Sequence, residues 1–119
     1  MKIQRFAHFS EMPPALLQYL CYLTMPIGLM RDSLKRYRTL NDDRPHTVIV
    51  ATDGEIVLGW CMTDRYDHFN VYVRPKYRRH GVGRRLAAAW LAQNGWARKK
   101  NVMLYTTGDA AGRLMQAVK

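Results

Sequence analysis

The segment that most constrains the fold is NVYVRPKYRRHGVGRRLAAAW, at residues 70–90. It begins with an alternation that is typical of a strand, passes through a basic Gly-x-Gly turn, and continues into an alanine-rich stretch that predicts a helix. A glycine turn that opens a helix presents unpaired backbone N–H groups, and the helix dipole adds partial positive charge there. Pyrophosphate is the natural ligand of such a turn.

Two glycines in a basic loop are weak evidence when they are taken alone. The third glycine of a dinucleotide-binding fingerprint is missing, and the preceding strands form a predicted hairpin meander instead of a βαβ unit. A P-loop is excluded as well, because no Gly-Lys-Ser/Thr closes the turn. The loop is therefore either a phosphate cradle of another kind or a basic surface patch that contains two glycines.

The rest of the chain predicts the order strand, two helices, three antiparallel strands, helix, strand, helix. Asp53-Gly54 is the strongest short hairpin signal, because both central residues of that turn must tolerate positive φ. Gly95 predicts the end of the helix before it. The predicted strands are residues 2–9, 47–52, 55–63, 68–73 and 101–107, and the predicted helices are 15–23, 28–40, 81–94 and 108–119.

Length and composition indicate a single globular domain over residues 1–119, with 48% apolar residues. Charges interrupt every apolar stretch before it could span a bilayer, and the first residues lack the apolar core of a secretion signal. We therefore expect a cytoplasmic protein with no membrane partner. Cys21 and Cys61 lie far apart, which favours buried thiols over a disulfide or metal site, and the scattered histidines predict no zinc site.

Charge is the unusual bulk property. Nineteen Lys and Arg against nine Asp and Glu give a net charge of +10. Such a field favours nucleic acid, phosphorylated cofactors or acidic protein surfaces, without choosing among them. One face of the predicted helix 28–40 carries several of these cations, and it is either a solvated surface or a binding face.

The segment VYVRPKYRRHGVGRRL resembles the acetyl-CoA signature of the GNAT superfamily, the general amino-N-acetyltransferases. The upstream hairpin TDGEIVLGW is similar to the second and third strands of that family. This resemblance implies an α+β fold with a mixed sheet, in which an antiparallel meander is flanked by helices. The matching signature positions are Val73, Pro75, Arg78, Gly81, Gly83 and Leu86.

The resemblance also implies acetyl-CoA as cofactor. The strand before the loop would pair with the pantetheine arm, and the loop amides would bind the pyrophosphate. Family members usually continue into two strands after their last helix; without them one sheet edge is exposed, so we expect a homo-oligomer formed through that edge. The implied cofactor-binding residues are Val71, Tyr72, Val73, Arg78, Arg79, His80, Gly81, Val82, Gly83, Arg84 and Asp109.

Transfer to an amine needs a proton acceptor, because a lysine-type amine is neutral in only about one molecule in 2,500 at pH 7. Asp67, which stands where histone-acetylating relatives carry a glutamate, is the first candidate for the base; it is one methylene shorter and is expected to act through a water. His68 is a rival with a better-matched pKa. In a strand the two side chains would point to opposite faces, so at most one faces the cleft. The last helix of many members carries a tyrosine that protonates the thiolate; here that helix has none, and Tyr105 on the preceding strand is the candidate.

Three functions remain open on the sequence. The first is an acetyl-CoA-dependent N-acetyltransferase that acts on a protein lysine or another amine of an acidic or polyanionic partner. The second is a non-catalytic module of the same fold that binds a protein or nucleic acid. The third, a basic nucleic-acid-binding protein without cofactor, lacks support from any helix-turn-helix, zinc-finger or aromatic RNP pattern.

Overall fold

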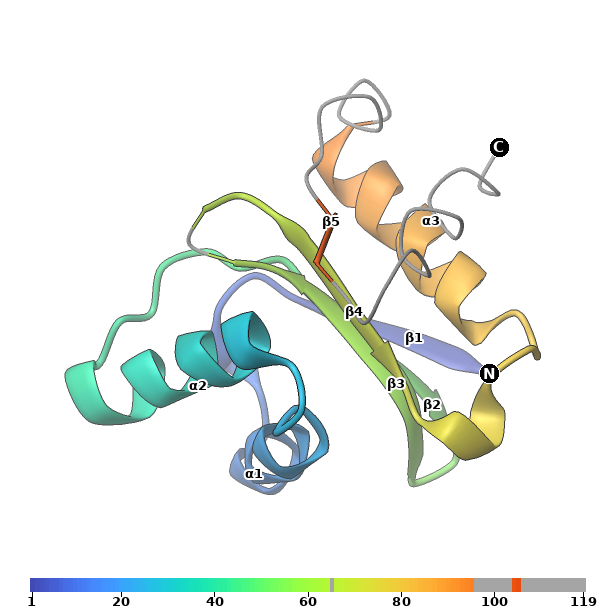
Figure 1. Cartoon of the computed structure of the whole chain (residues 1–119), viewed down its shortest axis with the longest axis horizontal. Coiled ribbons are helices and arrows are strands. Elements are labelled where there is room, and N and C mark those ends of the chain that lie inside the picture. Colours follow the sequence, from blue (N-terminus) through green and yellow to red (C-terminus); the bar gives the residue numbers. More distant parts are fainter. Residues whose placement is uncertain (65, 96–103, 106–119) are drawn as a thin grey trace.

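The computed structural model describes residues 1–64, 66–95 and 104–105. A twisted sheet carries helices α1 and α2 on one face and α3 on the other (Figure 1). The elements are β1 (Lys2–Phe6), the 3-10 turn η1 (Phe9–Glu11), α1 (Pro14–Leu23), α2 (Gly28–Leu40), β2 (Val48–Asp53), β3 (Ile56–Thr63), β4 (Phe69–Val73), the 3-10 turn η2 (Pro75–Tyr77), α3 (Val82–Asn94) and β5 (Leu104–Tyr105).

The sheet has the order β1-β2-β3-β4-β5, which is also the order of the strands along the chain. The first four strands are antiparallel to their neighbours, and β5 runs parallel to β4. This mixed sheet with flanking helices confirms the α+β fold that the sequence predicts. Within the described part of the chain, no helix is long and apolar enough to cross a membrane.

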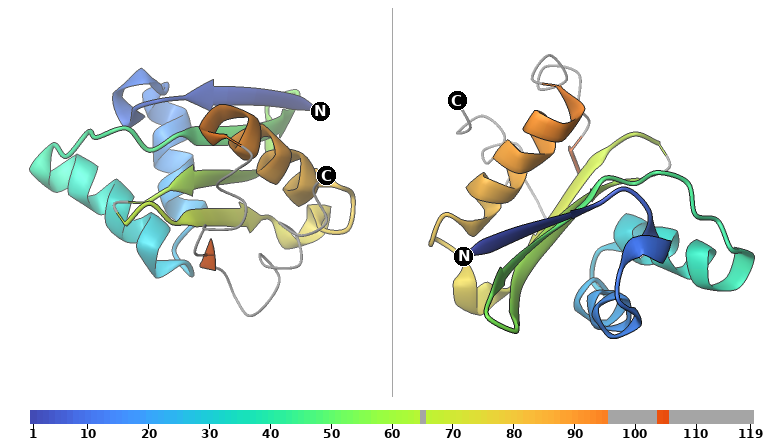
Figure 2. Two further views of the ribbon diagram at one scale, coloured as in Figure 1. Left: turned by 90° about the horizontal axis from the view of Figure 1, so that it is seen from above. Right: turned by 180° about the vertical axis from the view of Figure 1, so that it is seen from behind.

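Two apolar layers hold the helices on the sheet, and the right-hand view of Figure 2 shows α3 on one side of the sheet with α1 and α2 on the other. Leu86 and Trp90 of α3 pack on Ile49, Phe69 and other side chains of one sheet face. On the opposite face, side chains of α1 and α2 such as Leu34 join the cluster that surrounds Trp60. Burial on both faces explains why β2 and β3 read as nearly continuous apolar runs.

Most of the predicted elements are confirmed. Gly54 adopts the positive φ of 61° that the Asp53-Gly54 hairpin requires. The helix predicted at residues 81–94 is α3, and Gly95 caps it. The first strand is shorter than predicted, because the chain leaves the sheet after Phe6 and forms η1. Of the predicted strand 101–107 only β5 is described, and the predicted helix 108–119 lies outside the described residues.

Strand β3 contains a β-bulge opposite β2, and beside the bulge it approaches β4 closely. Ala51 pairs with Gly59 while Thr52 pairs with Val57, so Leu58 is an extra residue in β3. A Cβ atom placed on Gly59 would lie 2.6 Å from the carbonyl oxygen of Tyr72 in β4. Glycine at position 59 therefore allows the contact between β3 and the end of β4 that leads into the Gly-x-Gly turn.

We expect Gly59→Ala to lower the free energy of unfolding by about 2 kcal/mol, because backbone atoms must move to admit the methyl group. Urea unfolding followed by circular dichroism measures this change. Gly28→Ala is the matched control, since a Cβ at Gly28 meets no atom within 4 Å, and its effect should stay within about 0.5 kcal/mol. Equal effects of the two substitutions would show that the contact with β4 is unimportant.

His46 is a buried histidine in the loop before β2, and its side chain is 2% exposed. Its Nδ1 donates a hydrogen bond to the carbonyl oxygen of Thr63 at 2.9 Å, and its ring stacks on Phe9. Burial lowers the pKa of His46 below its usual value, although the hydrogen bond to Thr63 opposes this change.

A stability change with pH follows from this depressed pKa. Unfolded His46 takes up a proton near pH 6.5, whereas the folded side chain stays neutral to lower pH. The unfolded state then binds more protons, so the stabilisation is present above pH 6.5 and is lost as the pH falls through the folded-state value. In His46→Gln we expect the urea midpoint to depend less on pH between pH 7.5 and 5.5 than it does in the natural sequence. An unchanged slope would show that His46 is not the source of the pH dependence.

Candidate functional site

The turn between β4 and α3 has the backbone geometry of an anion cradle. Arg79 and Gly81 both adopt positive φ, at 67° and 81°. Gly81 is the N-cap of α3, and no side chain caps the helix there. The first N–H groups of a helix have no partner within it, so those of Val82, Gly83 and Arg84 have no helical partner and can receive a ligand. A Cβ on Gly81 would meet nothing within 4 Å, which leaves the approach open.

Formal positive charge surrounds this helix start. Arg79 precedes Gly81, Arg84 and Arg85 follow it, and all three side chains are exposed, as is that of His80. Together with the dipole of α3, these groups favour a ligand that carries several negative charges. The residues present therefore fit a pyrophosphate, as the sequence predicts.

Arg78 lies differently from its basic neighbours. Its Nε donates a hydrogen bond to the carbonyl oxygen of Val73 at 2.8 Å, and its guanidinium lies 5.8 Å from the ring centroid of Tyr72. Arg74 also holds the end of β4, because its Nη1 donates to the carbonyl oxygen of Val57 at 3.0 Å. These two arginines fix the path of the chain from β4 into the cradle.

The edge of β4 is only partly covered. Within the described residues, β5 pairs with β4 at two positions, Phe69 with Leu104 and Asn70 with Tyr105. The later part of β4, Val71 to Val73, has no described strand on that side. Its backbone groups can therefore pair with an extended ligand, in the manner of an added strand.

The three catalytic candidates lie around the other end of β4. Asp67 is exposed in the turn between β3 and β4, with a positive φ of 63°. His68 follows it, and its side chain is 13% exposed. The strand starts only at Phe69, so the predicted alternation does not apply to Asp67 and His68. Tyr105 pairs with Asn70, whereas Asp109 lies outside the described residues.

Asp64 is a buried carboxylate that the sequence analysis did not single out. One of its oxygens accepts hydrogen bonds from the backbone N–H groups of Tyr66 and His68, at 2.8 and 3.0 Å. The other oxygen accepts one from Asn70 Nδ2 at 3.0 Å and lies 3.7 Å from Nδ1 of His68. Asp64 thus organises the turn and places a carboxylate beside the imidazole of His68.

No group of three or more potential ligands gathers around a metal position in the described part of the chain. Cys61 is fully buried, and burial raises the pKa of its thiol far above its usual value, so it is not a nucleophile. Cys21 is half-buried and free. The expectation of buried thiols is therefore met at Cys61 and only partly at Cys21.

Comparison with known families agrees with this geometry. A family model described as an acetyltransferase (GNAT) domain matches residues 44–117, more than half of the chain. The chain therefore belongs to the GNAT acetyltransferase family, whose members in general transfer an acetyl group from acetyl-CoA to an amine. No curated protein and no solved structure matches the chain significantly.

Proposed function

We propose that this protein is an N-acetyltransferase that uses acetyl-CoA and modifies an amine on a protein or another acidic or polyanionic partner. The observation that carries the proposal is the uncapped start of α3, opened by Gly81 and flanked by four exposed basic side chains. It directly follows β4, whose edge at Val71–Val73 has no strand beside it among the described residues. This arrangement suits a long ligand that is anionic at one end and forms backbone-like hydrogen bonds along its arm.

Each part of the cofactor then has a place. The N–H groups of Val82, Gly83 and Arg84, with the cations beside them, would hold the pyrophosphate. The edge of β4 at Val71–Val73 would hold the pantetheine. Arg78 would then either give up its hydrogen bond to the carbonyl oxygen of Val73 or share that oxygen with the pantetheine. The bound cofactor supplies a thioester whose acetyl carbonyl is open to attack by an amine.

For the proton acceptor, the geometry favours His68 over Asp67. An imidazole is neutral and basic near pH 7, whereas an ordinary carboxylate is a weaker base. The buried carboxylate of Asp64, 3.7 Å from Nδ1, would stabilise the positive charge that His68 gains with the proton. Asp67 has an exposed position in the turn and would act through water.

Two measurements test this function. Calorimetry with CoA and acetyl-CoA should show binding at micromolar concentrations, and its absence would overturn the assignment of the cradle. Incubation with trideuteroacetyl-CoA and a cell lysate, followed by mass spectrometry, should then reveal lysine or amino-terminal sites that carry the heavy acetyl group. Binding without any new heavy acetylation would favour the non-catalytic module.

The acidic or polyanionic acceptor and the homo-oligomer remain predictions. Sedimentation of the full chain at micromolar concentration tests the oligomer, and a monomer under these conditions would count against it. The positive field of the protein predicts that acetylation of acidic acceptors weakens as salt is added.

A further inference from the structure

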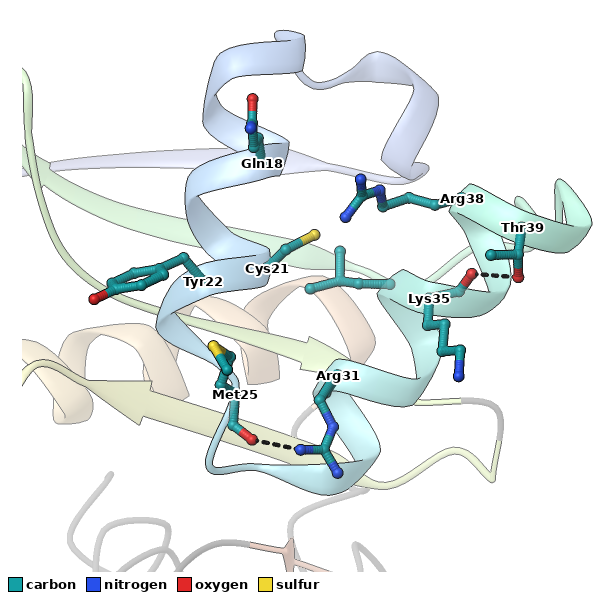
Figure 3. A pocket seen from close by; sticks show the side chains of 9 residues that line it. Gln18, Cys21, Tyr22, Met25, Arg31, Lys35, Arg38 and Thr39 are labelled. Carbon is teal, nitrogen blue, oxygen red and sulfur yellow. Dashed lines mark hydrogen bonds between the residues drawn. The ribbon is translucent and has the colours of Figure 1, made fainter.

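A groove of about 610 Å³ runs between α1 and α2 and shares no residue with the cradle (Figure 3). In this view the two helices form its walls, and the sheet passes behind them. Its lining follows helical spacing on both walls. One wall is formed by Gln18, Cys21, Tyr22 and Met25, and the other by Arg31, Leu34, Lys35, Arg38 and Thr39.

The first wall carries two exposed apolar side chains beside the polar Gln18. Tyr22 is 71% exposed and Met25 is 57% exposed, which is unusual for side chains of this size beside each other. Leu34, which is 1% exposed, forms the base of the groove and belongs to the core beneath it. Apolar area is therefore available to a partner on one side of the groove.

The second wall is cationic. Arg31, Lys35 and Arg38 are exposed, and no carboxylate among the described residues forms an ion pair with any of them. Arg36, on another side of α2, does pair with Asp42. Arg31 also donates a hydrogen bond from Nη1 to the carbonyl oxygen of Met25 at 2.9 Å, which closes one end of the groove.

We propose that this groove docks an amphipathic helix with an acidic side, supplied by a partner protein. The three cations lie at positions i, i+4 and i+7 of α2, so they extend over roughly 10.5 Å, two turns of helix. Carboxylates with the same spacing on an incoming helix would face them, while its apolar side would cover Tyr22 and Met25. Charge complementarity therefore selects an acidic segment, and the apolar wall selects an amphipathic one.

The wall formed by Cys21, Tyr22 and Met25 disfavours nucleic acid as the occupant of the groove. Phosphate backbones gain their affinity from cations, and the side with Cys21, Tyr22 and Met25 offers them none. A small molecule is disfavoured as well, because compact ligands are usually enclosed on most sides, whereas both walls here are open to solvent.

The experiment uses the full chain and a displayed library of peptides of about 15 residues, long enough to form a helix. We expect enrichment of sequences with apolar residues at helical spacing and Asp or Glu beside them. Fluorescence anisotropy measures the affinity of the selected peptide. The bound peptide should also protect Cys21 from alkylation by iodoacetamide, with buried Cys61 as the internal reference. Enrichment of peptides without acidic residues, or protection absent at Cys21, would overturn the proposal.

Matched charge variants locate the binding. The double variant Lys35→Glu with Arg38→Glu should lower the affinity for the peptide about tenfold. Lys2→Glu with Arg5→Glu makes the same change in net charge on β1 and should have a much smaller effect. Equal losses of peptide affinity in the two double variants would show that the attraction is nonspecific. A DNA duplex that displaces the peptide and itself protects Cys21 would also overturn the proposal. Lys35→Gln with Arg38→Gln repeats the test if the reversed charges disturb α2.

Discussion

Gly83→Asp is expected to abolish CoA binding while the fold stays intact. Gly83 is the second residue of α3, so a carboxylate there would stand against a pyrophosphate held by the first N–H groups. The repulsion should weaken CoA on the order of 100-fold or more in calorimetry. An acidic residue in the first turn is favourable for the helix itself, because it complements the dipole.

That last point separates ligand loss from misfolding. The thermal midpoint of Gly83→Asp should be close to that of the natural sequence. Gly83→Ala is the control for bulk without charge, and its loss of CoA affinity should be clearly smaller. If Gly83→Asp binds CoA normally, the start of α3 is not the pyrophosphate site.

The second large effect is expected from His68→Gln. Removal of a proton acceptor typically costs on the order of 100-fold or more in turnover. His68 lies at the end of β4 away from the cradle, so the KM for acetyl-CoA should change little. The rate is measured as release of free CoA with an acceptor identified by heavy-acetyl mass spectrometry, across pH 6 to 9.

Asp67→Ala is the matched comparison, because it removes the neighbouring rival from the same turn. We expect turnover of Asp67→Ala to stay within a few-fold of the natural sequence, with an unchanged pH profile. The reverse result, a large loss in Asp67→Ala and none in His68→Gln, would assign the base to Asp67. Asp64→Asn, which keeps an acceptor for the turn amides, should lower turnover less than His68→Gln does.

Much of this fold could be predicted from the sequence because its signals are local. The Asp53-Gly54 turn needs only its two residues, and α3 follows from a glycine start, apolar spacing and Gly95. The cradle is local in the same way, since the residues from Arg79 to Arg84 adjoin one another in the chain. For this reason the loop that the sequence predicts lies at the start of α3 that the structure leaves without a side-chain cap.

The features that could not be predicted depend on contacts between distant segments. The bulge at Leu58 is defined by the register of β2 against β3, and the closeness of Gly59 to Tyr72 requires β4. The groove needs α1 and α2 side by side. Asp64 is an intermediate case: an Asp that accepts the N–H two residues later is a common turn pattern, but its burial against Asn70 is tertiary.

The strand order has a consequence for how the molecule assembles. The hairpins β2–β3 and β3–β4 join strands that adjoin in the chain, which favours their early formation. The two outer strands of the described sheet need longer connections, because β1 pairs with β2 across α1 and α2, and β5 pairs with β4 across α3. We therefore expect the β2–β3–β4 meander to form first, so that the edge of β4 exists before β5 pairs with its first residues.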